Sequence, residues 1–528
     1  MNSLPPELTT MILSHIGRHR SRYASVSQSW QHIIETSTFR QINITGTSTH
    51  DYNEFKQIFA PKSRDGPRRQ TLVRGLEFCV VLPNVSQKRQ SKMQSTKESA
   101  ANNVAFTEAI VDFSSFLSSW LGETAGISLG ILAVGNESYG GSELHVVDGP
   151  LPLRNYFSFV GFDRSTLAGL RPHSGGKLDV LPRIGELTLF EQQGRRLHPS
   201  VLQVLGEALP NTQRMDLTYF LVGRRRMELR RELRASFGRS LLSLATSLTH
   251  LTRLQIYGDD RDPDNQQFAP GNMLDEASSG RDMFSVGLRA LSQIPSLQIL
   301  YLDGCHILSA EVFEDSDGID SSGSWPSLTH LRILSVGCTT PDGGWYMTGD
   351  PSSGDRGSES GNSSDYEAQS VIDSDDSDVS DFTPEHKWKR QDGMSPWHLF
   401  RLTPNEEEMV PFLLAMVRAV SRMPKMKKME VVWDDAIEGI YYAPGEGSEV
   451  LPGRPDYEAA ESFYNSPAGS PRWIFHLLRG FAEWEFPPEL KNALTESVGE
   501  GNTRVGRLRS LEWMRANPGR PARDDEKF

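Results

Sequence analysis

The sequence has little cysteine: three residues among 528, at Cys79, Cys305 and Cys338. They lie far apart, and no C-x-x-C pair is present. This pattern excludes a disulfide framework and a cysteine-based zinc site, and it favours a reducing compartment. Cys305 and Cys338 each follow a predicted strand and a glycine, so we interpret them as small core or turn residues.

Long apolar runs are also absent. The longest uncharged apolar segment, residues 124–136, is shorter than the roughly 20 residues that a membrane-spanning helix needs. The first residues lack the basic region and apolar run of a secretory signal. We therefore expect a soluble protein of the cytoplasm, the nucleus or both, with no membrane partner. A net charge of -13 disfavours nucleic acid, so we expect no nucleic-acid partner either.

Patterns that carry chemistry are missing too. The chain has no G-x-x-x-x-G-K-[ST], no G-x-G-x-x-G after a strand, no H-E-x-x-H and no G-x-S-x-G. The histidines are scattered. His250 and His330 occupy the same place in two copies of the string SLTHL, which favours a turn role over catalysis. We predict no catalytic residue, no metal site and no cofactor.

The N-terminus, by contrast, is rich in apolar residues at helical spacing. One stripe follows Pro5 and Pro6, which suit the first turn of a helix, and a second follows Ser25. The stripes are Leu8, Ile12 and Ile16, then Val26, Trp30, Ile33 and Ile34. About forty residues cannot bury this much apolar surface in a core of their own. A partner, or the domain behind, must cover it.

These residues resemble a known family. Leu4-Pro5-Pro6-Glu7-Leu8, Ile12-Leu13 and Val26-Ser27-x-x-Trp30 follow one another as in the F-box, the adaptor-binding module of SCF-type ubiquitin ligases. Residues 21–35, with Thr38-Phe39, are similar to F-boxes of filamentous fungi. The resemblance implies docking on a Skp-type adaptor that is bound to a cullin. The implied adaptor contacts are Leu4, Pro5, Pro6, Leu8, Ile12, Leu13, Ile16, Val26, Trp30 and Ile33.

Beyond the N-terminus, short predicted strands alternate with helices. Residues 72–82 and 127–134 predict strands on either side of a helix at 106–120, with a polar loop at 86–103. The order strand, helix, strand suggests a parallel arrangement. Residues 406–423 predict another helix, and residues 429–433 predict the strand that follows it.

Several of the later strands share a pattern. Three strings superpose on a proline, two share SLTHL, and one earlier copy is plausible; they begin at Pro210, Pro295, Pro424, Ser247, Ser327 and Gly185. Each carries an apolar pair two residues apart, which faces one side of a short strand. Helices precede Pro295 and Pro424, so the unit is a helix, a proline turn and a strand.

Units of this kind, stacked on one another, form a solenoid, and the pattern resembles degenerate leucine-rich repeats. The strands recur after 28, 39, 46 and 34 residues from Leu187 to Leu334, so several units carry insertions. The predicted fold is α/β: a short N-terminal helical F-box, then an irregular leucine-rich-repeat-like α/β solenoid interrupted by a disordered acidic loop. An ordinary α/β domain with similar helix–strand joints is the alternative.

Two segments are strongly charged. The arginines of residues 224–234 form either a phosphate-binding stripe or, as the interspersed Glu and Leu favour, the solvated face of an amphipathic helix. Residues 343–382 are rich in Ser, Gly and Asp and cannot bury enough surface to offset the entropy of ordering. Serines such as Ser364 and Ser374 could accept phosphate there, although a solvated spacer is the simpler interpretation.

The sequence therefore predicts five parts. They are the F-box at 1–45, a leucine-rich-repeat-like domain at 70–342, a disordered acidic insertion at 343–392, a final repeat with a C-terminal cap at 393–515 and a disordered tail at 516–528. The resemblance implies a non-catalytic substrate-recognition subunit of an SCF-type cullin ubiquitin ligase, with an unknown protein substrate held by the repeats for ubiquitin-dependent degradation. The alternatives are an F-box scaffold outside any ligase and an enzyme with an unrecognised site.

Overall fold

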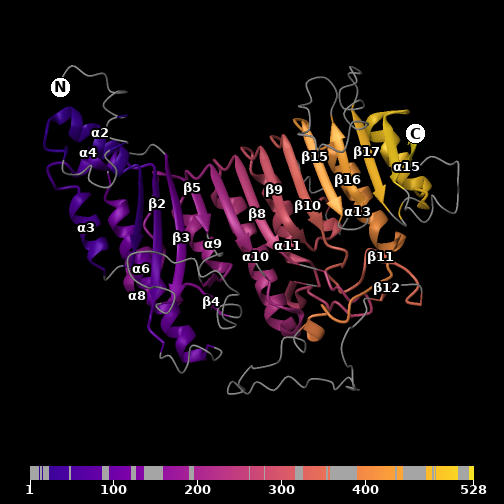
Figure 1. The fold of residues 1–528 in the computed structure, drawn as a ribbon, viewed down its shortest axis with the longest axis horizontal. Coiled ribbons are helices and arrows are strands. Elements are labelled where there is room, and N and C mark those ends of the chain that lie inside the picture. The colour runs from indigo at the N-terminus through magenta and orange to yellow at the C-terminus, as the bar shows by residue number, and fades with distance from the viewer. Residues whose placement is uncertain are drawn as a thin grey trace. The chain divides into compact units, whose positions relative to one another are not determined.

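The chain forms two compact units, residues 1–216 and 217–528, in the computed structural model (Figure 1). Strand β7 (Arg214–Tyr219) contains the boundary between them. The described residues are 11, 15, 23–46, 49–85, 94–120, 126–135, 158–189, 195–219, 221–260, 262–278, 280–314, 325–352, 355–356, 389–433, 437–443, 471–478, 481, 483–508 and 523–527. Both units combine helices with a mostly parallel sheet, which confirms the α/β class. Within these ranges, no helix has the length and apolar character needed to cross a bilayer.

Unit 1 is built around four parallel strands that lie side by side in chain order, β1, β2, β3 and β5. Its strands are β1 (Gln41–Thr45), β2 (Gly75–Leu82), β3 (Ile127–Gly135), β4 (Phe159–Val160), β5 (Ile184–Leu189) and β6 (Arg196–Leu197). Its helices are α2 (Gln28–Thr38), α3 (His50–Ile58), α4 (Gly66–Gln70), α6 (Thr96–Ser118), α8 (Arg164–Leu170) and α9 (Ser200–Ala208). The strands predicted at 72–82 and 127–134 are therefore confirmed.

Helix α6 covers one face of this sheet. Phe113 of the helix stacks on Phe78 of β2, with ring centroids 4.1 Å apart. The helix begins at Thr96, inside the segment that the sequence predicted to be a loop at 86–103, so that prediction is wrong from residue 96 onward. The reason is a capping box: Ser95 accepts from the Glu98 N–H, and Glu98 accepts from the Ser95 N–H.

Unit 2 contains a longer sheet. Its strands are β8 (Arg253–Asp259), β9 (Ile299–His306), β10 (His330–Val336), β11 (Met347–Thr348), β12 (Asp355–Arg356), β13 (His398–Leu399), β14 (Thr403–Pro404), β15 (Lys428–Trp433), β16 (Ile437–Ala443), β17 (Arg472–Leu478), β18 (Thr503–Leu508) and β19 (Arg523–Lys527). Its helices are α10 (Met227–Ser247), α11 (Met283–Ala290), α13 (Glu406–Val420) and α15 (Pro488–Val498). Short 3-10 turns, including η6 (Leu291–Gln293) and η7 (Ala310–Val312), connect them.

The sheet of unit 2 changes direction along its width. Strands β8, β9, β10 and β15 are parallel and lie in chain order (Figure 1). Strand β16 is antiparallel to both β15 and β17, β18 is parallel to β17, and β19 is antiparallel to β18. Strand β19 lies inside the segment predicted to be a disordered tail at 516–528. Polar residues give no strand signal, and β19 is held by main-chain pairing with β18.

One face of the parallel strands packs on the helices. Phe284 of α11 lies between Phe237 of α10 and His306 of β9, and Phe412 of α13 packs edge-on against Trp433 of β15. The opposite face carries the alternate residues of each strand, which are only partly buried. Gly304 allows β9 to pass close to β8, since its φ is +79° and an added Cβ would meet the Gly258 oxygen.

The repeated strand pattern is present in the structure. Six segments share a nine-residue unit whose first, fourth, seventh and ninth side chains are buried. They begin at Leu181, Leu209, Leu248, Ile294, Trp325 and Met423. In five of the six, the N–H of the fourth residue donates to the carbonyl of the first, which forms a tight turn before the strand. The predicted order of helix, proline turn and strand is confirmed at Pro295 and Pro424.

The SLTHL match, however, is out of register by three residues. In the sheet, Leu254 and Leu331 both align with Leu300 of β9, whereas the shared string had aligned Leu254 with Leu334. His250 and His330 are consequently not equivalent: His250 is exposed before β8, and His330 is the first residue of β10. The prediction of one turn role for both histidines is wrong.

The disordered insertion predicted at 343–392 is too wide. Trp345, Tyr346 and Met347 are buried, and the Tyr346 hydroxyl donates to the Leu308 carbonyl at 2.6 Å. Strand β11 pairs with β14, and β12 pairs with β13, so both ends of the insertion are built into unit 2. Aromatic side chains offset the ordering entropy of these ends. Residues 357–388 lie outside the described part of the chain.

Candidate functional site

Three of the ten predicted adaptor contacts, Val26, Trp30 and Ile33, can be placed, and the other seven lie outside the described residues. These seven are Leu4, Pro5, Pro6, Leu8, Ile12, Leu13 and Ile16. Val26 precedes α2 and is 53% exposed, so it does not share the helix face with Trp30 as predicted. Ser27 is the N-cap of α2 and accepts from the Trp30 N–H, which explains why the helix starts after Val26.

The surface before α2 combines buried and exposed apolar side chains. Trp30 and Ile34 are buried in a small cluster with Ala24 and Ile33, and the Tyr23 ring contacts Trp30. Tyr23 is 39% exposed, and Val26 is more exposed still. Trp30 therefore holds the chain entering α2, while Tyr23 and Val26 remain available for contact.

Helix α2 is fixed to unit 1 by a charged anchor. The buried Glu35 carboxylate pairs with Arg68, and Arg69 lies 3.0 Å from its other oxygen. Burial alone would raise the pKa of Glu35, but hydrogen bonds from Gln31, Arg68 and Arg69 hold it below its ordinary value. Any partner that contacts the start of α2 would thus bind a surface held firmly on unit 1.

In unit 2, the sheet face opposite the helices carries a polar network. Arg332 of β10 and Arg253 of β8 lie over the Tyr301 ring, with their guanidinium carbons 4.5 and 5.6 Å from its centroid. Asp303 accepts from Arg332 and from Gln255, each at 2.6 Å. Alternation along the strands was the one sequence signal for these side chains. Together they form a polar surface in which the side chains hold one another in place.

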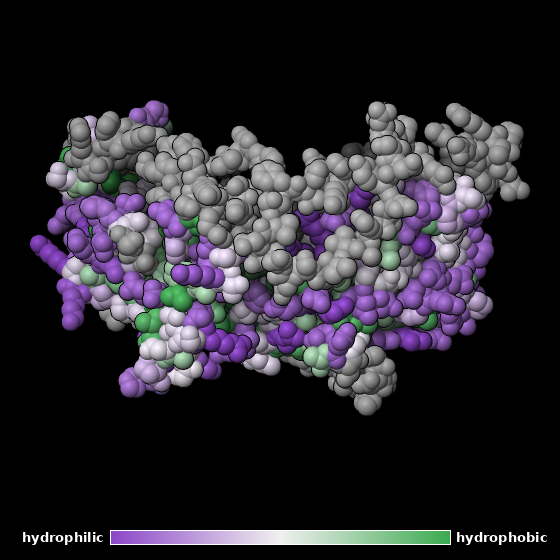
Figure 2. All heavy atoms as spheres, turned by 90° about the horizontal axis from the view of Figure 1, so that it is seen from below, coloured by the Kyte–Doolittle hydropathy of each residue, from purple (hydrophilic) through white to green (hydrophobic). Residues whose placement is uncertain are grey.

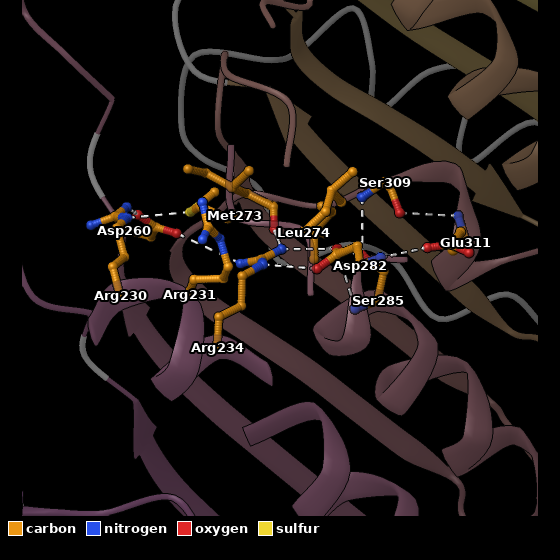
Figure 3. Close-up of polar contacts among 12 residues, drawn as sticks. Arg230, Arg231, Arg234, Asp260, Met273, Leu274, Asp282, Ser285, Ser309 and Glu311 are labelled. Atoms are coloured by element: carbon orange, nitrogen blue, oxygen red, sulfur yellow. Dashed lines mark hydrogen bonds and ion pairs between the residues drawn. The ribbon is translucent and has the colours of Figure 1, made fainter. Parts of the chain in front are cut away.

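A second charged group lies beside the carboxyl ends of β8 and β9, and Figure 3 shows its side chains. Arg234 of α10 forms two hydrogen bonds with Asp282, at 2.8 and 2.9 Å, and Arg230 pairs with Asp260. Arg230 and Arg234 are 3% and 1% exposed. The predicted solvated face for residues 224–234 is therefore wrong for these two arginines. Their acidic partners follow α10 by tens of residues, and no helical spacing reveals them.

The same network fixes the elements that follow. Asp282 caps α11 by accepting from the Ser285 N–H, and Ser285 Oγ accepts from the Ser309 N–H at 3.0 Å (Figure 3). Glu311 accepts from the Asp282 N–H at 3.0 Å and from Arg281 at 2.9 Å. Burial would lower the pKa of Arg234, but the Asp282 carboxylate raises it above its ordinary value. The charged groups of this network pair with one another, which indicates a structural role.

Two groups that could act in chemistry are buried and held in their neutral forms. Burial lowers the pKa of His306 to about 4, and its Nε2 lies 2.9 Å from the Asp303 carbonyl. Burial, with the nearby Glu77, raises the pKa of the Cys79 thiol to about 12. Across the described ranges, no group of three or more His, Cys, Asp and Glu residues is placed to hold a metal ion.

The described surface seen from below is mainly hydrophilic, and its hydrophobic residues form small separate patches (Figure 2). Comparison with known proteins adds no further constraint: no family model matches the chain, and neither does any curated protein.

Proposed function

We propose that this chain is the substrate-recognition subunit of an SCF-type cullin ubiquitin ligase. The N-terminal segment would bind a Skp-type adaptor, and the α/β units would hold a protein substrate near the ubiquitin-conjugating enzyme. Rate would come from proximity, because holding two reactants together raises their effective concentration. The catalytic groups would belong to other subunits.

The observation that carries this proposal is the surface before α2. Its residues resemble the F-box, and Tyr23 and Val26 are exposed next to a helix that Glu35 fixes to unit 1. Exposed apolar residues on a firmly held support are typical of protein contacts.

The experiment compares two valines of equal exposure. Val26 and Val180 are each 53% exposed in unit 1, and only Val26 lies in the F-box-like segment. We expect Val26→Asp to reduce co-purification of the adaptor at least about tenfold, because a charge would be desolvated at the contact, whereas Val180→Asp should leave it unchanged.

Measuring cullin in the same purification distinguishes a ligase subunit from an F-box scaffold outside any ligase. The adaptor together with the cullin is the result expected of a ligase subunit. The adaptor without cullin would instead indicate a scaffold outside any ligase, and equal loss in both valine variants would count against the assigned surface.

A further inference from the structure

The amino-terminal edge of the parallel sheet in unit 2 is basic, although the whole chain is acidic. Four segments form this edge where they enter β8, β9, β10 and β15: residues 247–254, 294–300, 325–331 and 423–429. They contain no Asp or Glu. Their basic residues and histidines are His250, Arg253, His330, Lys425, Lys427 and Lys428, and we call this surface the basic edge.

The sheet register brings these side chains together. Arg253, Ile299, His330 and Lys428 are direct neighbours across β8, β9, β10 and β15. Because adjacent strands lie about 4.8 Å apart, the charged positions span roughly 15 Å. The amino ends of these strands lie along the same side of the sheet in Figure 1.

The lysines of the turn before β15 are accessible. Lys425 and Lys427 are exposed, and the Lys425 ammonium lies 3.3 Å from Ser327 Oγ. Neither lysine has a carboxylate partner within the described residues. Lys428 is different, because Glu430 lies 3.5 Å from it. Among the described residues, no carboxylate therefore compensates the charge of Lys425 and Lys427.

We propose that the basic edge binds an acidic polypeptide segment. An extended peptide places alternate side chains about 6.6 Å apart, so its carboxylates can follow cations carried on neighbouring strands. Nucleic acid fits less well. The Tyr301 ring beside the edge is already contacted by two guanidinium groups, so this ring offers no open platform for stacking of a base.

This inference deepens the proposed function, because it names the class of segment that a substrate would carry. It rests on that function for its biological role. Peptide binding is measured without adaptor or cullin. A failure of the basic edge to bind the peptide is therefore distinguishable from a failure of the proposed ligase function.

The test uses the full chain and a fluorescent peptide of alternating glutamate and serine, about 20 residues long, in about 50 mM salt. We expect the peptide to bind the wild type, and Lys425→Glu with Lys427→Glu to weaken binding at least about tenfold. Lys62→Glu with Lys97→Glu is the matched control, since it alters the net charge equally at exposed lysines of unit 1.

Three results would overturn the proposal: no peptide binding by the wild type, equal loss in both double variants, or an oligothymidylate that binds the basic edge as tightly as the peptide. Thermal unfolding of each variant confirms that it is folded. A basic-edge variant that unfolds is replaced by Lys425→Gln with Lys427→Gln, for which a smaller loss in the same direction is expected.

Discussion

At the scale of single residues, α10 holds two arginines of opposite character. Arg234 is buried on Asp282, while Arg239, five residues later, pairs with Asp275 at 2.9 Å and has a half-exposed side chain. We expect Arg234→Met to lower the free energy of unfolding by about 3 to 5 kcal/mol, because it leaves a buried carboxylate without its cation. Arg239→Met should cost about 1 kcal/mol or less. Urea unfolding of both variants measures the difference.

Equal costs for the two variants would show that the Arg234 network does not support the fold. The sequence predicted the helix that carries these arginines but not their burial. A run of Arg, Glu and Leu looks the same whether its cations face water or a carboxylate brought in from another segment. Asp260 and Asp282 become partners only through the turn of the chain after β8.

His306 makes the stability depend on pH. Its pKa is about 4 in the folded chain and near 6.5 when unfolded, so between these values the unfolded chain binds more protons. Stability is therefore complete above about pH 6.5 and falls as the pH drops toward 4. We expect a loss of roughly 2 to 3 kcal/mol at pH 4.5 from this group.

Replacement by glutamine checks that assignment. In His306→Gln the fall in unfolding free energy between pH 7 and 4.5 should be smaller than in the wild type by about the same amount. Parallel pH profiles for the two proteins would mean that His306 is not held neutral. Glu35 affects stability at lower pH. Because its pKa is lowered in the folded chain, its contribution to stability is lost only as the pH falls below the ordinary value near 4.5.

At the scale of elements, comparison of the six nine-residue units identifies one position that lowers stability. Their fourth residue is apolar in every copy except the second, where Thr212 is fully buried and its hydroxyl has no hydrogen-bond partner among the described residues. We expect Thr212→Val to raise the free energy of unfolding by about 1 kcal/mol, because valine keeps the shape and removes an unsatisfied polar group. A destabilised variant would show that the hydroxyl has a partner after all. Thermal and urea unfolding both measure this.

The units also show what short-range pattern reveals about a sheet. The alignment on proline gave the right register for Leu300 and Met429, because the turn, the strand start and the buried pair all depend on one another. The shared string SLTHL gave the wrong register, because the same residues occupy different positions of the nine-residue unit in its two copies. Helix α6 was predicted too short, as its first two turns carry few apolar residues and its start depends on the Ser95 cap.

The acidic insertion is the second prediction at this scale. Replacing residues 357–388 with a Gly-Ser linker of about six residues should leave the fold intact and raise the unfolding free energy by about 1 kcal/mol, from the shorter loop alone. The paired strands β12 and β13 already hold the flanking chain. A loss of several kcal/mol would show that the removed residues pack on unit 2.

At the scale of the whole molecule, the chain forms two α/β units, and the F-box-like sequence belongs to the first of them. The sequence alone predicted the α/β class and the order of most strands. It did not predict which apolar residues near α2 stay exposed, because Val26 and Trp30 fit one helical stripe, whereas the Ser27 cap leaves Val26 outside the helix.

The central claim is that the N-terminal segment binds a Skp-type adaptor, and the most direct test is the affinity of the purified chain for purified adaptor. Leu4→Ala with Pro5→Ala removes two proposed anchors, and burying a leucine is worth roughly 1.5 to 3 kcal/mol. We predict that the wild type binds and that the double variant, still folded by circular dichroism, binds at least about tenfold more weakly. A wild type that does not bind the adaptor, or a variant that binds it equally well, would contradict the account.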